Sequence, residues 1–265
     1  MSILPMPRVD NGYPTSDGRP MAETDIHRDL MIDLIATLRA YYAREENVYV
    51  SGNLLICYDR ANGRRHVSPD VFVVEGVEKH TRDNFLVWEE GRAPCFVIEL
   101  TSASTRDEDL TTKMALYRDV LKVKEYYLFD PNGEYLTPSM RGLRLRGGVY
   151  RQIRPVAGRL PSQTTGLHLE RDGTALRFWN PVTEERLPLP IEDAEQRVAE
   201  EALARRSAER RAAAETRTRE AAEQRATGEA LARREAEGRA AASAVENTRL
   251  RRELAILRGE APPAD

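Results

Sequence analysis

The chain has 265 residues, a formal net charge of −3 and two cysteines. This length suffices to bury a core in one large domain or two small ones. The charge balance excludes a protein that coats nucleic acid through an overall basic excess, although a DNA enzyme needs only a local basic surface. No segment approaches about 18 consecutive apolar residues, and Met1–Asp10 lacks the apolar core of a signal peptide. We therefore expect a cytoplasmic protein without membrane spans.

Composition divides the chain near Pro190. Residues 191–257 contain 19 Ala, 14 Glu or Asp and 14 Arg, but no Lys, Pro, Phe, Tyr or Trp. Such a composition predicts a single long helix of about 100 Å. We accordingly predict a globular domain over 1–190, a charged helix over 191–258 and a disordered tail over 259–265.

The globular part begins with an irregular arm over residues 1–22, which are rich in Pro, Gly, Asp and Ser. A helix should follow from about Glu23 to Ala43, since its apolar residues recur at helical spacing and Thr24 or Asp25 can cap its first turn. His27 lies in that first turn. We expect a surface or capping histidine there rather than a catalytic one.

Runs of β-formers between turn signals predict the strands of the domain. Pro69 places Asp70 in an extended conformation at the entrance of one strand. Glu99 is the one ionisable residue in another, where an unpaired charge would be costly to bury. Cys57 and Cys95 lie in apolar runs and should be buried, reduced thiols. The predicted strands are 48–50, 53–58, 68–75, 95–100 and 125–129, with a helix over 106–121. This order predicts a mixed α/β sheet.

Residues 135–169 contain no Asp or Glu but several arginines. Segments 143–146 and 149–153 flank Gly147-Gly148 and predict a β-hairpin. Segments 167–169 and 174–178 predict a second hairpin. The outward positions of the first include Arg141, Arg144, Arg146, Arg151 and Arg154. These arginines indicate either a surface that contacts the DNA backbone or a solvated hairpin that balances acidic neighbours.

The long helix has an ambiguous heptad pattern. Ile191, Val198 and Leu254 share one heptad phase, and Leu250 and Leu257 occupy the matching second position. Arginines fill the same phase in the middle of the helix, at Arg205, Arg219 and Arg233. We favour a coiled coil that forms a homo-oligomer, most simply a dimer; the alternative is a solvated single helix with Glu–Arg pairs four residues apart.

Asp70, Glu99 and Lys113 form a candidate site. Carboxylates on neighbouring strands can converge on a hard divalent cation such as Mg²⁺, with Mn²⁺ as a possible substitute, and leave positions for water and phosphate. Lys113, on the following helix, can orient the attacking water or help to deprotonate it, and can stabilise charge on the phosphate. Tyr117 shares its helix face. This set indicates a metal-assisted phosphodiester hydrolase.

Residues 12–190 resemble the bacterial Uma-type restriction endonucleases, a branch of the PD-(D/E)XK nuclease superfamily. Five stretches in order make the resemblance specific. They are residues 13–27, Ser68-Pro-Asp-Val-Phe-Val-Val, Phe96-Val-Ile-Glu-Leu-Thr-Ser-Ala-Ser-Thr-Arg106, Asp109-Leu-Thr-Thr-Lys113 and Glu125-Tyr-Tyr-Leu-Phe-Asp-Pro131. The resemblance implies a restriction-endonuclease-like core of order α-β-β-β-α-β and Mg²⁺-dependent cleavage of DNA.

The resemblance also implies roles for individual residues. Asp70 and Glu99 would bind the metal ion, and Leu100 would offer its backbone carbonyl. The superfamily's usual lysine falls at Thr101, which cannot play that role, so Lys113 resembles a migrated replacement. Glu23 is a possible accessory acid.

Two functions remain open at this stage. One is a metal-dependent DNA endonuclease. The other is a non-catalytic, nuclease-like interaction protein that is oligomerised or docked through its C-terminal helix.

Overall fold

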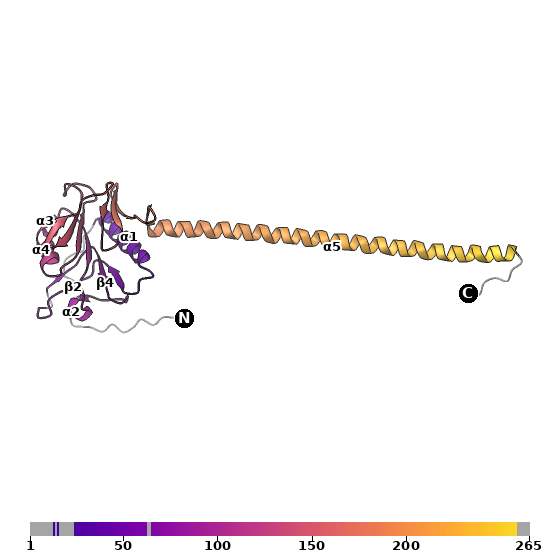
Figure 1. Cartoon of the computed structure of the whole chain (residues 1–265), viewed down its shortest axis with the longest axis horizontal. Coiled ribbons are helices and arrows are strands. Elements are labelled where there is room, and N and C mark those ends of the chain that lie inside the picture. Colours follow the sequence, from indigo (N-terminus) through magenta and orange to yellow (C-terminus); the bar gives the residue numbers. More distant parts are fainter. Residues whose placement is uncertain (1–12, 14, 16–23, 63–64, 259–265) are drawn as a thin grey trace. The chain divides into compact units, whose positions relative to one another are not determined.

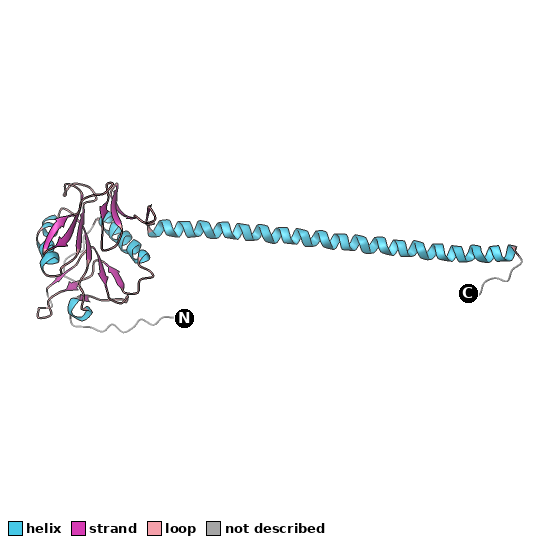
Figure 2. Ribbon diagram, viewed as in Figure 1, coloured by secondary structure: helices cyan, strands magenta, loops and turns pink. Residues whose placement is uncertain are grey.

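The computed structural model describes residues 13, 15, 24–62 and 65–258. Glu23 and the predicted tail 259–265 lie outside the described residues. The chain divides into two compact units, Met1–Ala194 and Glu195–Asp265. Figure 2 shows that strands belong to the first unit, whereas the second is helical.

A six-stranded sheet forms the centre of the first unit, with the order β1-β4-β6-β7-β8-β9. Strands β6 and β7 are parallel, and the other neighbours in this sheet are antiparallel. Its strands are β1 (Val48–Ser51), β4 (Val71–Glu75), β6 (Phe96–Leu100), β7 (Glu125–Phe129), β8 (Met140–Arg146) and β9 (Val149–Gln152).

The expected order α-β-β-β-α-β is confirmed. Helix α1 (Asp25–Tyr41) precedes β1, with Thr24 as its N-cap, and the second helical segment connects β6 to β7. That segment was expected as one helix over 106–121. It is instead divided into α3 (Arg106–Leu110) and α4 (Thr112–Asp119), because Thr111 has non-helical angles of φ −125° and ψ −80°.

Two smaller sheets flank the central one. The first has the order β3-β2-β5 and is built from β2 (Ile56–Cys57), β3 (His66–Val67) and β5 (Phe85–Leu86), with α2 (Val87–Glu90) directly after β5. The second contains the expected C-terminal hairpin, extended to four strands: β10 (Leu160–Pro161), β11 (His168–Asp172), β12 (Ala175–Asn180) and β13 (Glu185–Arg186). The strand predicted over 53–58 is shorter than expected, because Asn53 has a positive φ of 46°.

The side chains of the central strands alternate between two apolar cores. Figure 1 shows α1 and α4 on opposite sides of these strands. One core joins α1 and the C-terminal sheet to residues such as Ile98 and Tyr127. The other joins α4 and the β3-β2-β5 sheet to residues such as Val97 and Tyr126. Because successive strand residues point to opposite faces, the central sheet is covered on both sides. Both cysteines are free, buried thiols as predicted: Cys57 lies in β2 and Cys95 directly precedes β6.

The second unit consists of most of helix α5 (Pro190–Leu257). Proline is favoured at the first helical position because it has no N–H to leave unpaired. None of the residues of α5 is buried, and four Arg–Glu ion pairs with i,i+4 spacing lie along it. No helix in the described part of the chain is both long and apolar enough to span a membrane.

Candidate active site

Gly52 lets the chain approach Asp70 closely. It follows β1 and lies against the turn that leads into β4, where the Asn53 N–H donates to the Pro69 carbonyl at 2.8 Å. A Cβ atom on Gly52 would stand 1.9 Å from the Asp70 carbonyl oxygen and 2.6 Å from Ile35 Cδ1. A side chain at this position would therefore displace the backbone that carries Asp70.

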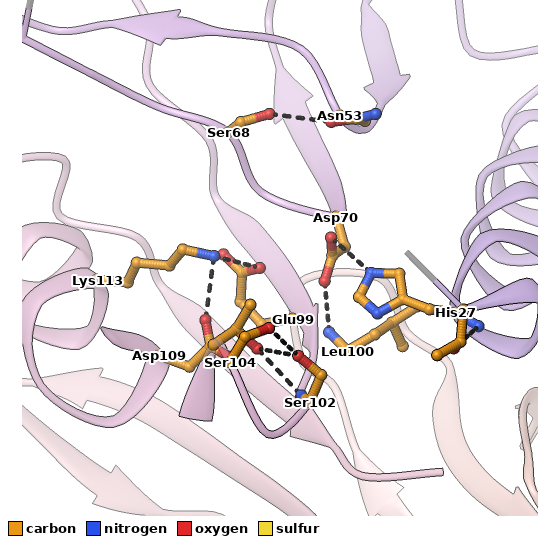
Figure 3. A network of polar contacts seen from close by, with 12 residues as sticks. His27, Asn53, Ser68, Asp70, Glu99, Leu100, Ser102, Ser104, Asp109 and Lys113 are labelled. Carbon is orange, nitrogen blue, oxygen red and sulfur yellow. Dashed lines mark hydrogen bonds and ion pairs between the residues drawn. The ribbon is translucent and has the colours of Figure 1, made fainter. Parts of the chain in front are cut away.

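The Asp70 carboxylate connects β4 to both β6 and α1 (Figure 3). Its Oδ2 accepts a hydrogen bond of 2.6 Å from the Leu100 N–H, and its Oδ1 lies 3.1 Å from His27 Nε2. The Asp70 side chain is 15% exposed and the His27 side chain 11%. His27 is held in the first turn of α1, where its N–H donates to Thr24 Oγ1. Asp70 is thus oriented from two sides and still reaches solvent.

Glu99 lies in β6 among apolar residues, and two side chains of α4 compensate its burial. Lys113 Nζ donates to Glu99 Oε2 at 2.9 Å, and the Tyr117 hydroxyl donates to Oε1 at 2.6 Å. The two partners are one helical turn apart and therefore share a face of α4. Both carboxylate oxygens consequently have a donor.

Asp109 is a third carboxylate in this cluster. It lies at the end of α3, it is 1% exposed, and its Oδ1 stands 3.0 Å from Lys113 Nζ. Lys113 of α4 therefore contacts two buried acids, Glu99 of β6 and Asp109 of α3. The break in the helix at Thr111 does not disrupt the ion pair between Asp109 and Lys113.

The charges in this cluster are unequal, because Asp70, Glu99 and Asp109 surround one ammonium group. Burial raises the pKa of Glu99 well above its usual value; Lys113 opposes this shift, and Asp70 and Asp109 add to it. Burial likewise raises the pKa of Asp109, again against the effect of Lys113. Burial by itself would lower the pKa of Lys113, but the three carboxylates more than offset this and raise it. An additional cation would relieve the excess negative charge.

The donor atoms suit a hard divalent cation. Asp70 and Glu99 offer carboxylate oxygens, each with lone pairs beyond those used in the present hydrogen bonds. Because a strand residue directs its N–H and C=O toward the same neighbouring strand, the Leu100 N–H that binds Asp70 places its carbonyl on the Asp70 side as well. In the described ranges, no group of three or more His, Cys, Asp or Glu side chains has the arrangement of a metal centre. Two carboxylates are compatible with Mg²⁺, which takes one or two protein carboxylates and completes its shell with water and phosphate.

The five candidate DNA-contacting arginines occupy different places. Arg141 is in register with Leu128, which is in register with Glu99, so these three project from one face at one level of the sheet. Arg144 projects from the opposite face, where its guanidinium donates to the buried Glu125 at 2.7 Å. That contact holds the Arg144 guanidinium in the interior of the fold.

Arg146, Arg151 and Arg154 are exposed and lie farther from the site. Arg151 is opposite Arg144 in the β8–β9 register and therefore shares its face. Arg146 is five residues along β8 from Arg141, about 17 Å at the rise of a strand. Of the five arginines, Arg141 is the one on the face and at the level of Glu99.

The structure places five of the predicted site residues close together: Asp70, Glu99, Leu100, Lys113 and Tyr117. Two further members were not predicted, His27 and Asp109. The spacing of four residues between Asp109 and Lys113 could have indicated that Asp109 belongs to the site. No sequence signal pointed to His27, because 43 residues separate it from Asp70.

Comparison with known proteins bears on the same region. The Uma2 family model, described as "Putative restriction endonuclease", matches residues 7–172. A crystal structure of a protein from Anabaena variabilis, described as a putative nuclease belonging to DUF820, has 17% sequence identity and a TM-score of 0.40. That similarity covers 56% of this chain and 79% of the other. A comparison with curated proteins gave no match. The family match spans the whole stretch that supplies Asp70, Glu99 and Lys113.

Proposed function

The chain belongs to the Uma2 family, and we propose that it is a metal-dependent endonuclease that hydrolyses phosphodiester bonds of DNA. Family membership supports a nuclease. The observation that supports the metal-dependent chemistry is the cluster in which the Glu99 and Asp109 carboxylates contact the Lys113 ammonium while Asp70 lies near enough to add its negative charge. Such an excess of negative charge in a mostly buried site suits a divalent cation better than it suits the anionic substrate alone.

In this proposal Asp70, Glu99 and the Leu100 carbonyl hold Mg²⁺, for which Mn²⁺ can substitute. The ion, when bound, supplies Lewis-acid stabilisation of the phosphate and activates water for attack. His27 and Tyr117 are positioning residues, because each binds one carboxylate and fixes its orientation. The accessory role suggested for Glu23 remains a prediction about a residue outside the described part of the chain.

Lys113 has a distinct role. Its pKa is raised because the effect of Glu99, Asp109 and Asp70 exceeds that of burial, so the side chain stays an ammonium at neutral pH. A protonated lysine cannot accept the proton of the attacking water. We infer that Lys113 stabilises negative charge on the phosphate and on Glu99, and this favours electrostatic stabilisation over the alternative role as a base.

DNA would reach the site from the Asp70 side, because Asp70 is 15% exposed whereas Glu99, on the covered face of the sheet, is 1% exposed. Arg141 lies on that face two strands away, about 10 Å at the usual strand spacing. We propose that Arg141 contacts a phosphate next to the scissile one. Arg146, Arg151 and Arg154 are at most more distant backbone contacts.

The test is cleavage of plasmid and single-stranded DNA by the full chain in Mg²⁺ or Mn²⁺. Asp70→Asn and Lys113→Met should reduce cleavage at least about a hundredfold, the usual scale for losing one preorganised electrostatic contact. Lys124→Met is the matched control, because Lys124 forms an exposed ion pair with Glu75 at 2.8 Å. The control should cleave as the wild type does.

Two results would reject the proposal. Cleavage that survives both site substitutions would assign the activity to other residues or to a contaminant. Absence of cleavage together with absence of Mg²⁺ and Mn²⁺ binding in calorimetry would leave the non-catalytic interaction protein, for which the long exposed helix α5 is the supporting feature.

A further inference from the structure

Helix α5 contains a repeat of 14 residues. The pattern Ala-Glu-x-Arg begins at Ala194, Ala208, Ala222 and Ala236, and one further copy, at Ala214, falls outside this period. Fourteen residues are two heptads, and a repeat that is a strict multiple of seven keeps the same face in contact when two helices supercoil to the left. A solvated single helix needs no such period. The repeat therefore indicates a helix that pairs with another helix.

One face of α5 follows this period, and we call it the seam. It consists of Ile191, Ala194 and every residue of α5 that follows either of them at intervals of seven. Its two ends are apolar, with Ile191 and Val198 at one end and Leu250, Leu254 and Leu257 at the other. All five side chains are between 46% and 84% exposed. The seam thus leaves an apolar cluster without cover at each end of the helix.

The middle of the seam alternates between small and charged layers. Each charged layer pairs a glutamate with an arginine four residues later: Glu201 and Arg205, Glu215 and Arg219, Glu229 and Arg233. Pairs of alanines separate them. Alanine lets two helices approach closely. The three seam arginines form ion pairs within α5 with Glu209, Glu223 and Glu237, so an opposing helix is favoured when it brings seam glutamates toward these arginines and not like charges together.

That preference distinguishes the two possible orientations. In a parallel pair each seam residue faces its own copy, so all three arginine layers and all three glutamate layers would bring like charges together. In an antiparallel pair the first heptad position of one helix faces the second heptad position of the other. In the register proposed below, Arg219 and Arg233 face glutamates, and the alanines between the charged layers face other alanines, whereas Arg205 faces Ser243 and Glu201 faces Asn247.

We propose that α5 pairs with α5 of a second copy of this chain as an antiparallel coiled coil in which Ile191 faces Leu257 of the second copy. In the same register Val198 faces Leu250 and Ala194 faces Leu254, so both apolar ends are covered. Glu215 faces Arg233 and Arg219 faces Glu229. Two-fold symmetry repeats every one of these contacts.

The register uses the whole helix. Ile191 and Leu257 are the second and the last residue of α5, so no part of the seam is left unpaired. Each N-terminal unit is joined by the chain to the start of its own helix, and antiparallel pairing therefore separates the two units by about the helix length of 100 Å. If the proposed function holds, the two active sites of one dimer act on separate DNA segments rather than on the two strands of one site.

Spin-label distances in the full chain test the orientation and the register without DNA. Ser207→Cys and Thr227→Cys place a label outside the seam, and the wild type, whose two cysteines are buried, is the labelling control. The proposed register predicts a distance of about 50 Å between the two Ser207→Cys labels and about 20 Å or less between the Thr227→Cys labels. A parallel pair would give about 20 Å or less at both positions. A register shifted by one 14-residue repeat would give about 30 Å at both positions in one direction, or about 70 Å at Ser207→Cys and about 20 Å or less at Thr227→Cys in the other. Any of these results, or a monomer in analytical ultracentrifugation, would overturn the proposal.

Exchanging charges provides a second test. Arg219→Glu should raise the dissociation constant of the dimer at least about tenfold, because it creates two contacts between like charges. Adding Glu229→Arg should restore it, since residues 219 and 229 face each other only in this register. Failure of the second substitution to rescue the first, with helix content unchanged by circular dichroism, would reject the register.

Apolar substitutions supply a matched pair. Leu250→Ala should raise the dissociation constant about tenfold or more, because the loss counts twice in the symmetric dimer. Leu231→Ala makes the same chemical change on the opposite side of the helix and should leave the constant unchanged. Equal effects of the two substitutions would contradict the assignment of the seam.

Discussion

Replacing Lys113 with methionine removes the positive charge that pairs with both Glu99 and Asp109. Methionine keeps most of the length and apolar surface of the lysine stem, so the change isolates the charge. The Lys113 side chain is 13% exposed, and the two carboxylates are each 1% exposed. Loss of one partner from a buried pair typically costs about 3–5 kcal/mol, since the remaining charge is left uncompensated.

Lys124→Met is the control for this loss of stability, because it removes a similar ion pair at an exposed position. Its ion pair with Glu75 has an N–O distance of 2.8 Å, against 2.9 Å for Lys113 and Glu99, but its partners are 63% and 44% exposed. Water and salt screen such a pair, and its loss should cost about 0–1 kcal/mol. The two substitutions thus differ in burial and not in contact geometry.

Urea unfolding followed by tryptophan fluorescence measures both costs in the full chain. Trp88 and Trp179 belong to the unit Met1–Ala194, so the signal reports this unit and not the long helix. Without Mg²⁺ at pH 8, Lys113→Met should lower the free energy of unfolding by about 3–5 kcal/mol and Lys124→Met by less than about 1 kcal/mol.

The cost of Lys113→Met should also depend on pH. Burial raises the pKa of Glu99 and of Asp109, and Lys113 opposes both shifts, so its removal raises them further. An acid whose pKa is higher in the folded state binds protons more tightly there, and stability therefore falls as the pH rises above the unfolded pKa of about 4. The variant should be closer to the wild type at pH 5 than at pH 8. Equal costs for the two lysine substitutions at pH 8, or a cost independent of pH, would refute the inferred electrostatics.

Three further predictions concern residues that position the site. Gly52→Ala should lower cleavage about a hundredfold, because the added Cβ must displace the backbone of Asp70 by about 1 Å or more. His27→Ala should weaken Mg²⁺ binding in calorimetry about 10- to 100-fold, the usual cost of losing a residue that orients a metal ligand. Arg144→Gln should destabilise the fold by about 3 kcal/mol in urea because it removes the cation that compensates the buried Glu125 carboxylate, whereas Arg151→Gln should change stability by less than about 0.5 kcal/mol.

Each of these predictions has a contradicting result. Wild-type cleavage by Gly52→Ala would show that the backbone at Asp70 can shift without harm. Unchanged metal affinity in His27→Ala would make its contact with Asp70 incidental. Similar stability of the two arginine variants would mean that Arg144 is not needed to compensate its partner inside the fold.

The sequence determined the elements and most of the candidate site. Apolar runs and turn signals predicted strands β6 and β7 within one residue, because local side-chain pattern and turn chemistry fix such buried strands. An Asp, Glu and Lys triple occurs by chance in most sequences, so Asp70, Glu99 and Lys113 could be selected only because a proline precedes Asp70 and Glu99 lies in an apolar strand.

Only the tertiary structure decided how these residues are paired. His27 meets Asp70 because α1 packs against the sheet near the start of β4, and no local pattern reports a contact across 43 residues. Arg144 faces Glu125 and not solvent because of the β7–β8 register. A shift of one residue in that register would reverse both faces. The chemistry of the site follows from residue types present in the sequence, but which charge compensates which depends on packing between distant elements.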